Sequence, residues 1–315
     1  MSAGLGDGSA LAREFEAQRP RLLRLAYAST GSLAEAEDCV QEAWLRLQRA
    51  AERDPVRDLG AWLTTTVSRL ALDALGSARA RRERYAGPWL PEPLIERLAD
   101  TADGAARPGA DPADQVTLDE SVSMALLVVL EALTPAERTA FLLHDVFGLG
   151  YDEIAGVVGR PVAAVRQLAS RARRRVHDDR SRAQATGAQP TRAQHRELLD
   201  AFTKASAEGD LERLMALLDP DVVWRADGGA VRAEPRTAQG ARPIAALIAS
   251  YAQRPPRQML KALVNGAPGL VIRDADGVLS VLALTSDGDR ITAIDVIRDP
   301  AKLGRAAGLL DENVF

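Results

Sequence analysis

The chain has 315 residues, enough for two or three domains, and its 46% hydrophobic and 27% charged residues are typical of a globular protein. A formal net charge of −4 excludes a wholly basic nucleic-acid coat, and the single cysteine, Cys39, excludes a disulfide framework or a four-cysteine zinc site. No apolar run is long enough to span a bilayer, and the N-terminus lacks a signal-peptide pattern, so we expect a soluble cytoplasmic protein.

Composition divides the chain into four segments. Residues 11–80 and 122–182 have helical patterns, residues 81–121 are rich in proline, glycine, alanine and aspartate, and residues 192–305 combine helical and strand patterns. The segment 81–121 holds five basic and nine acidic residues, so it accounts for the whole net charge of −4. We therefore expect two helical domains, separated by an acidic linker, and a third, α+β domain.

A capping box begins the helix that we expect over residues 33–50. Ser32 can cap the first turn, and Glu35, three residues later, can close the box. One side of this helix is apolar, and the other carries Glu35, Asp38, Gln41 and Glu42. Carboxylates near a helix N-terminus complement the helix dipole, and an acidic stripe can equally bind a basic partner. The spacing alone favours the dipole interpretation.

The next helix is expected over residues 59–80 and leads into a run of arginines. It combines an aromatic residue, hydroxyls and an arginine, and the candidate contacts to single-stranded DNA are Trp62, Thr65 and Arg69. Such side chains bind single strands by stacking on bases and by contacting phosphates. Trp62 alone is still more often a core residue than a stacking platform.

The second helical segment has the pattern of a helix-turn-helix. Thr134-Pro135-Ala136-Glu137 is a capping box with proline at the first helical position, and the helix it begins is expected to end at Gly148. Further on, Ala155 precedes Gly159 by four residues, and Val165 follows it by six. This spacing allows two helices to approach closely around a left-handed glycine turn, with an apolar residue between them.

The helix after this turn, expected over residues 162–177, has two contrasting faces. Its apolar face combines Val165, Leu168, Ala169, Ala172 and Val176. The candidate DNA contacts on this helix are Arg166, Gln167, Ser170, Arg171, Arg173 and Arg174. Arginine and glutamine can read base edges in a major groove while other arginines contact phosphates. A merely solvated basic face is the alternative, but the turn spacing and the separated faces together favour DNA binding.

Three motifs in a fixed order resemble a known family. They are Ala36-Glu37-Asp38-Cys39-Val40-Gln41-Glu42-Ala43-Trp44, then Ala61-Trp62-Leu63 with Leu70-Ala71-Leu72-Asp73, and then Leu133-Thr134-Pro135-Ala136-Glu137-Arg138. Over residues 11–180 the chain is similar to group-four, extracytoplasmic-function (ECF) bacterial sigma factors. In two places it departs from many members of that family, with Arg69 in place of asparagine and Leu168 in place of arginine.

The resemblance implies roles for the motifs. Asp38, Gln41 and Glu42 would face the clamp helices of the RNA polymerase β′ subunit, and the β flap would be a second polymerase contact. Residues from Trp62 to Asp73 would melt and read the −10 promoter element, and the helix 162–176 would read the −35 element. The partners implied are therefore core RNA polymerase and promoter DNA, with no membrane.

The last segment predicts an α+β domain. Two helical stretches around Gly209-Asp210 lead into strand patterns at residues 222–225, 269–273, 278–284 and 290–298, with a helix over 243–252. Asp276-Gly277 and Asp287-Gly288 are typical turn pairs between these strands. This order is similar to the SnoaL-like branch of the cone-shaped α+β fold shared with nuclear transport factor 2.

Three short boxes resemble those of sigma factors that carry such an extension. They are Trp89-Leu90-Pro91-Glu92-Pro93 in the linker, Asp227-Gly228-Gly229-Ala230, and Asp299-Pro300-Ala301-Lys302-Leu303. The resemblance implies that the extension regulates the sigma factor in cis, in place of a separate anti-sigma protein. Each box also has an ordinary interpretation as a turn or a linker. Aromatic residues in linkers seldom stay solvated, however, which favours docking of the first box on the last domain.

Two other functions remain open for the last domain. It could be a SnoaL-type enzyme, an isomerase, cyclase or hydrolase, or it could be a sensor whose bound ligand shifts docked and released populations. Its one histidine, His195, has no legible nucleophile or metal partner in the sequence, and Asp227 is more typical of a turn than of a cavity base. We therefore expect no catalytic residue, cofactor or metal, and a transcription factor rather than an enzyme.

Overall fold

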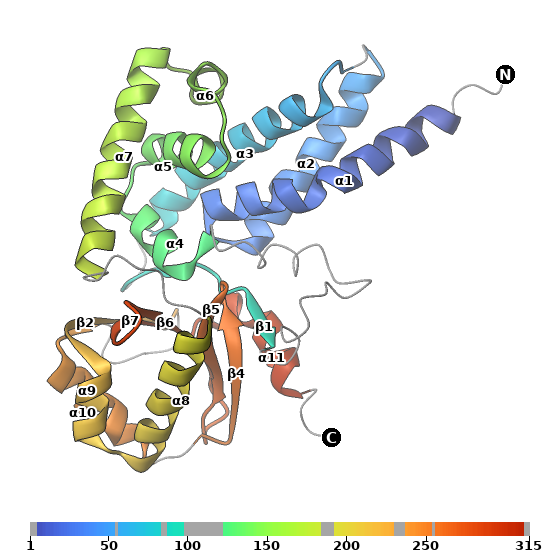
Figure 1. Ribbon diagram of the computed structural model, residues 1–315. Coiled ribbons are helices and arrows are strands. Elements are labelled where there is room, and N and C mark those ends of the chain that lie inside the picture. The colour runs from blue at the N-terminus through green and yellow to red at the C-terminus, as the bar shows by residue number, and fades with distance from the viewer. Residues whose placement is uncertain are drawn as a thin grey trace. The chain divides into compact units, whose positions relative to one another are not determined.

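A computed structural model describes residues 5–53, 56–82, 87–97, 122–183, 192–229, 237–253 and 256–311 (Figure 1). The chain forms two compact units. The first comprises Met1–Glu83, Ala106–Ser121 and Leu130–Arg175, and the second comprises Arg84–Ala105, Val122–Val129 and Val176–Phe315. The linker residues 87–97 thus belong to the same unit as the C-terminal domain, although more than 90 residues of sequence separate them.

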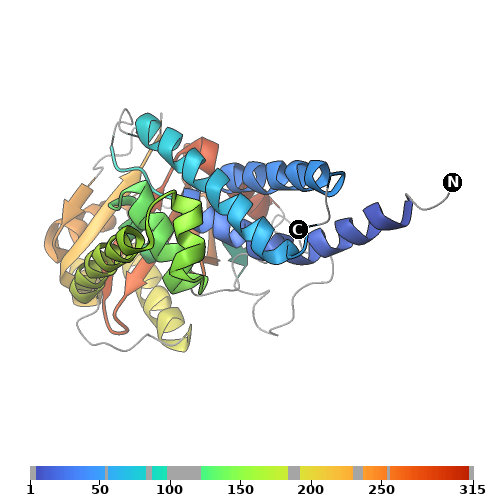
Figure 2. The ribbon, with the colours of Figure 1, turned by 90° about the horizontal axis from the view of Figure 1, so that it is seen from above.

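The first unit begins with three long helices, α1 (Leu5–Thr30), α2 (Leu33–Ala51) and α3 (Leu59–Arg82), which pack against one another (Figure 2). The predicted cap of α2 is present, since the backbone N–H of Glu35 donates to the Ser32 hydroxyl at 3.5 Å. The apolar side of α2 is buried as predicted, through Leu33, Ala36, Val40, Ala43 and Leu47.

The rest of this unit, in its described residues, is built from four helices and a π-helical turn (Leu142–Val146). The helices are α4 (Met124–Glu131), α5 (Pro135–Phe141), α6 (Tyr151–Val158) and the longer α7 (Val162–Ala183). The first part of α4 and the last part of α7, from Val176, belong to the second unit. The predicted capping box at Thr134 and the left-handed Gly159, with φ of 67°, are both present. The helix after Thr134 changes to π geometry, which the sequence did not predict, and α7 runs beyond the predicted His177 because no glycine or proline follows before residue 187.

A buried arginine joins α5 to the end of α1. Arg138 is 1% exposed and donates from Nη2 to the backbone carbonyl of Ala28 at 2.9 Å. Its Nη1 pairs with the Glu131 carboxylate. The positive charge therefore lies near the C-terminal carbonyls of α1, where the helix dipole favours a cation.

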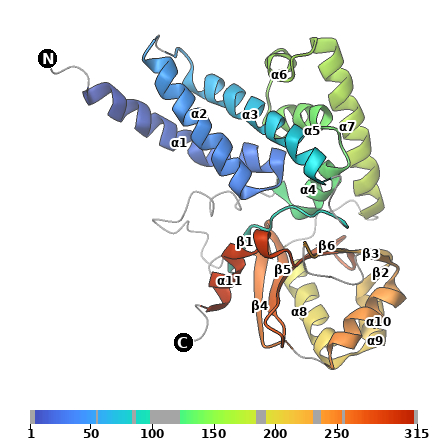
Figure 3. The same cartoon turned by 180° about the vertical axis from the view of Figure 1, so that it is seen from behind.

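The second unit contains a seven-stranded sheet with the order β1-β4-β5-β6-β7-β2-β3. The strands are β1 (Ile95–Arg97), β2 (Leu218–Asp227), β3 (Thr237–Gln239), β4 (Gln258–Val264), β5 (Ala267–Arg273), β6 (Leu279–Ser286) and β7 (Ile291–Ile297). Neighbouring strands are antiparallel except for β7 and β2, which are parallel. The linker strand β1 forms one edge of the sheet, next to β4 (Figure 3).

The two faces of this sheet bury different segments. Helices α8 (Arg192–Glu208), α9 (Leu211–Leu217) and α10 (Ala241–Tyr251) cover one face and share a core with Trp224, Leu270 and Leu282. The other face packs against linker residue Leu90, the start of α4 at Met124, and α11 (Gly304–Asp311), which follows a short 3-10 turn (Pro300–Lys302). The predicted α+β class is confirmed, and its four predicted strands correspond to β2, β5, β6 and β7.

Candidate functional site

The acidic stripe of α2 faces solvent in part. Asp38 and Gln41 are exposed, and Glu42 is half-buried, with its Oε1 accepting a hydrogen bond from Nε of Arg46 at 2.8 Å. Cys39 lies beneath them, buried, and burial together with the neighbouring carboxylates of Glu35, Asp38 and Asp73 raises its pKa to about 11. Asp38 and Gln41 are therefore accessible to a partner, while the thiol is neutral and enclosed.

The predicted −10 contacts lie along α3. Trp62 and Thr65 are half-buried, and Arg69 is exposed. The guanidinium of Arg69 nevertheless donates from Nη2 to the backbone carbonyl of Gly156, on α6, at 2.8 Å. In this conformation the helix predicted to read the −10 element thus contacts the first helix of the helix-turn-helix, an arrangement that the sequence did not reveal.

The basic helix α7 has the two faces that the sequence predicts. All five residues of its apolar face are buried: Val165, Leu168, Ala169, Ala172 and Val176. The candidate DNA contacts that are exposed are Arg166, Gln167, Ser170, Arg171 and Arg174. The guanidinium of Arg166 also lies over the Tyr151 ring, 5.5 Å from its centroid, which orients that side chain at the start of the helix.

Arg173 is the one candidate on α7 that is half-buried. It donates to the Asp145 carboxylate at 2.6 Å and to the Tyr151 hydroxyl at 2.8 Å, and its Nη2 lies 2.9 Å from Nδ1 of His144. The hydrogen bonds to Asp145 and Tyr151 raise the pKa of its guanidinium above the usual value. Arg173 therefore fixes α7 to the preceding elements, a role that helical spacing could not predict because its partners come from α6 and the π-helical turn.

Arg171 also contacts the protein. Its Nε lies 3.4 Å from the carboxylate of Glu137, and Nη1 of Arg175 lies 3.2 Å from the same group. Burial alone would raise the pKa of Glu137, but hydrogen bonds from the Thr134 hydroxyl and backbone N–H, with the two arginines, hold it below its usual value. The capping box of α5 thus also holds the middle of α7.

In the second unit, a buried carboxylate brings the three predicted boxes together. Asp227 is fully buried, and its Oδ2 accepts hydrogen bonds from the backbone N–H of Leu90 at 2.8 Å and from Nζ of Lys302 at 2.6 Å. Its Oδ1 accepts from the backbone N–H of Gly229 at 3.2 Å. We call Trp89, Leu90, Asp227 and Lys302 the linker-binding cluster.

Lys302 contacts every part of this cluster. Besides Asp227, its ammonium group donates to the backbone carbonyl of Leu90 at 2.5 Å and lies 4.0 Å from the centroid of the Trp89 ring. The remaining residues of the boxes surround it: Pro91, Pro93 and Leu303 are buried, Glu92, Gly228 and Gly229 are half-buried, and Pro300 is exposed. These contacts of Trp89 and Leu90 with Asp227 and Lys302 are the geometric basis for the predicted docking of Trp89–Pro93 on the last domain.

A second set of hydrogen bonds, which the sequence analysis missed, continues the attachment. Asn265 exchanges two bonds with Leu94, one from the backbone N–H of Leu94 to Oδ1 at 3.1 Å and one from its own N–H to the Leu94 carbonyl at 2.8 Å. The next residues form β1, in which Ile95 pairs with Val264. Asn265 and Gly266 have positive φ and form the two-residue turn between β4 and β5, so the Asn-Gly pair was the available signal.

Asp227 faces the linker, whereas its neighbour Ala226 lines a pocket on the opposite face of the sheet. Asp227 is therefore not among the residues that line this pocket. In the described part of the chain, no group of three or more His, Cys, Asp or Glu side chains could hold a metal ion. Nor does any described helix have the length and apolarity that a membrane crossing needs.

Comparison with known families identifies the two helical segments. Residues 15–81 match the model of sigma-70 region 2, and residues 123–176 match that of sigma-70 region 4. With the exposed basic face of α7, these matches define a sigma-70-type transcription initiation factor.

Similarity over nearly the whole chain narrows this class. The ECF RNA polymerase sigma factor SigJ of Mycobacterium tuberculosis is 41% identical over 90% of this chain and 86% of its own length. The probable ECF RNA polymerase sigma factor SigI of the same species is 38% identical over 92% of this chain and 93% of its own length. The crystal structure of SigJ superposes with a TM-score of 0.75, covering 93% of this chain and 98% of that chain at 37% identity. The chain therefore belongs to the ECF RNA polymerase sigma factors.

Proposed function

We propose that this sigma factor reads promoters with α3 and α7 and is regulated in cis through attachment of its linker to the C-terminal domain. In this scheme residues 11–80 bind core polymerase and the −10 element, residues 122–182 read the −35 element, and residues 192–305 regulate. Residues 81–121 connect the two functions. The protein would act in the cytoplasm as a regulator without catalytic activity.

The polymerase contact is assigned to the exposed side of α2. Asp38 and Gln41 are accessible, and the Glu42 carboxylate is held by Arg46 at the end of the same stripe. We assign this stripe to the β′ clamp helices and a second contact to the β flap, as the family resemblance implies. The negative charge of the stripe suits a basic partner surface.

The −35 contact is assigned to Arg166, Gln167, Ser170, Arg171 and Arg174. Their exposure on one helix, with the opposite face fully buried, is the arrangement that a recognition helix needs in a major groove. Arg173 would act indirectly, by holding α7 in place through Asp145 and Tyr151.

Promoter reading by α3 would need a change of partner at Arg69. Its guanidinium is hydrogen-bonded to Gly156 on α6, so a contact from Arg69 to DNA requires that this bond breaks. Trp62 and Thr65, half-buried on the same helix, are assigned to the −10 element as well. The described conformation therefore supports a resting state, from which polymerase and DNA separate α3 and α6.

Regulation is supported by one observation above all, the linker-binding cluster. A chain segment between the two sigma regions is held by a buried carboxylate, a lysine and strand β4 of the C-terminal sheet. Because this segment lies between α3 and α4 in the chain, its attachment restrains where both sigma regions can go when they bind polymerase. The C-terminal domain can thereby control initiation without a separate anti-sigma protein.

In vitro transcription with core RNA polymerase tests this function. The full chain should direct core enzyme to a two-element promoter selected from a genomic library, and Lys302→Met, which weakens the attachment, should change the yield at least severalfold. Lys261→Met is the matched control, because Lys261 forms an exposed pair with Asp200 at 2.7 Å. Identical yields from all three proteins would exclude regulation by the linker.

A second experiment addresses recognition. Arg166→Ala combined with Gln167→Ala should abolish transcription that depends on the −35 element while core polymerase still co-purifies with the variant. Loss of polymerase binding to the same extent would show that the two residues serve the fold and not the promoter. No transcription by the unaltered chain from any promoter would refute the assignment of both elements.

A further inference from the structure

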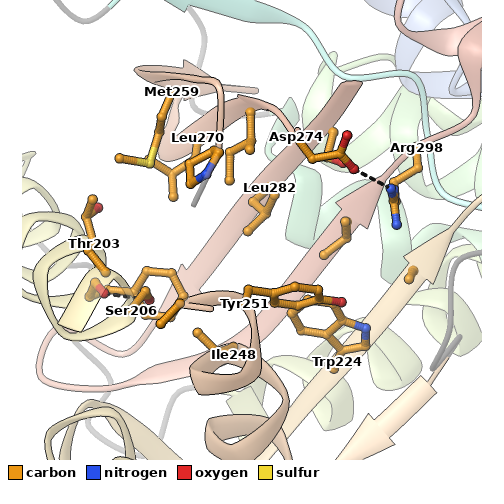
Figure 4. A pocket seen from close by; sticks show the side chains of 18 residues that line it. Thr203, Ser206, Trp224, Ile248, Tyr251, Met259, Leu270, Asp274, Leu282 and Arg298 are labelled. Atoms are coloured by element: carbon orange, nitrogen blue, oxygen red, sulfur yellow. Dashed lines mark hydrogen bonds and ion pairs between the residues drawn. The ribbon is translucent and has the colours of Figure 1, made fainter. Parts of the chain in front are cut away.

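The face of the sheet opposite the linker encloses a pocket of about 240 Å³, between the sheet and helices α8 and α10 (Figure 4). Its walls are mainly apolar and aromatic, and they include Trp224, Ile248, Leu270 and Leu282. For scale, a cavity of roughly 150 Å³ with apolar walls stays dry and binds benzene. This pocket therefore has room for a molecule larger than a single ring.

Two side chains at this pocket are unusually exposed for their size. Tyr251 is 47% exposed and Met259 is 42% exposed, and both line the pocket. Large apolar side chains left open to solvent in a concave site are typical of ligand-binding pockets, where a bound molecule covers them. Methionine also adapts its shape to different ligands.

One polar pair interrupts the apolar lining. Nη2 of Arg298 lies 3.2 Å from Oδ2 of Asp274, and both residues line the pocket (Figure 4). Nε of the same guanidinium is buried and has no hydrogen-bond partner among the described residues. A buried donor without an acceptor costs about 1–3 kcal/mol, so an acceptor atom supplied by a ligand would be bound favourably. Because Asp274 already balances the charge of Arg298, a neutral carbonyl suits this position better than a carboxylate.

We propose that the pocket binds a small planar molecule with two fused rings, or of similar size, whose one carbonyl oxygen accepts a hydrogen bond from Arg298. The rings would lie against Trp224, Leu270 and Leu282. The backbone N–H of Arg298 donates to the carbonyl of Asp227 at 2.7 Å, so this ligand would lie close to one member of the linker-binding cluster. The proposal concerns binding alone and does not depend on the regulatory scheme.

Equilibrium dialysis of the full chain with three naphthalene probes tests the proposal. 2-Acetylnaphthalene should bind in the micromolar to low millimolar range, and about tenfold more tightly than 2-ethylnaphthalene, which has the same shape without the acceptor. 2-Naphthoate should bind more weakly than the ketone. A tighter naphthoate would show that the site selects an anion, and equal affinity of the ketone and the ethyl compound would remove the role of Arg298; either result overturns this ligand class.

Variants locate the binding. Ser280→Phe, on β6, should fill the pocket and reduce ketone binding at least tenfold, and Thr203→Phe, on α8, should do the same from another element if the first variant does not fold. Arg298→Met should remove the preference for the ketone over the ethyl compound, whereas Arg290→Met, at the exposed turn before β7, should keep it. Unchanged ketone binding in a folded, filled variant would place the probe elsewhere and refute the proposal.

Discussion

Replacing Lys302 by methionine gives the sharpest test of how the linker is held. The substitution keeps much of the apolar stem but removes the cation that faces Asp227, the Leu90 carbonyl and the Trp89 ring. Asp227 is fully buried and the Lys302 side chain is only 11% exposed, so the carboxylate left behind would lack a cation in a nearly dry site. Breaking such a buried pair from one side typically costs about 3–5 kcal/mol.

Amide hydrogen exchange of the peptide that spans residues 87–97 measures this effect locally. We take the lower end of the range, because Asp227 keeps its hydrogen bonds from the N–H groups of Leu90 and Gly229. A loss of about 3 kcal/mol speeds exchange through local opening on the order of 100-fold, at 1.36 kcal/mol per factor of ten. The amides of Leu90 and Leu94 should show most of this increase.

Two controls separate the buried pair from general effects of losing a lysine. Lys261→Met removes a pair whose side chains are 39% and 62% exposed, so its cost should be at most about 1 kcal/mol and exchange at the linker should stay unchanged. Asp227→Asn combined with Lys302→Met removes both charges and should recover part of the protection. Exchange in Lys302→Met within threefold of the unaltered chain would refute the reasoning.

Three further predictions follow from single side chains. Gly229→Ala should destabilise the second unit by about 2 kcal/mol or more in urea unfolding, because the φ of Gly229 is 55° and a Cβ there would lie 2.5 Å from Cγ of Asp299. Gly277→Ala is the control, since Gly277 has φ of 83° with open space around it, and it should cost clearly less. Equal costs for the two variants would rule out the contact with Asp299. Because the pKa of Glu137 is lowered in the folded chain, its ionised form stabilises the fold above the unfolded pKa of about 4.3, and this gain is lost as pH falls through the folded pKa. The difference in unfolding free energy between the unaltered chain and Glu137→Gln should therefore be constant from about pH 7 to 5 and shrink below about pH 4. A difference independent of pH would contradict this. Cys39, buried with its pKa raised to about 11, should react with iodoacetamide at pH 8 at least 100-fold more slowly than in the urea-unfolded chain, and comparable rates would show that the site opens readily.

Local pattern was sufficient where one segment determines its own structure. The caps at Ser32 and Thr134, the turn at Gly159 and the buried face of α7 follow from spacing within a few residues, and all are present. The sequence also singles out the boxes around Trp89 and Lys302, because an aromatic side chain in a linker is costly to leave in water, and these two residues lie together in the structure.

Structure that depends on contacts between segments far apart in the sequence could not be predicted in the same way. Strand β1 is three residues long and has no strand pattern of its own, and it exists because β4 offers an edge. Strand β4 itself, Gln258–Val264, has no alternation of apolar and polar residues because its last three residues are buried one after another. The position of Arg173 on α7 is likewise visible in the sequence, whereas its hydrogen bond to Asp145, 28 positions earlier, is not.

The parallel pair of β2 and β7 sets an order of events during synthesis. Strand β2 cannot pair with β7 until residue 297 has been made, and Lys302 follows Leu90 by 212 positions. At about 5–20 residues per second, a ribosome needs roughly 10–40 s to cover that distance. Each new chain therefore passes through an interval in which both sigma regions have been made and the lysine that holds the linker has not.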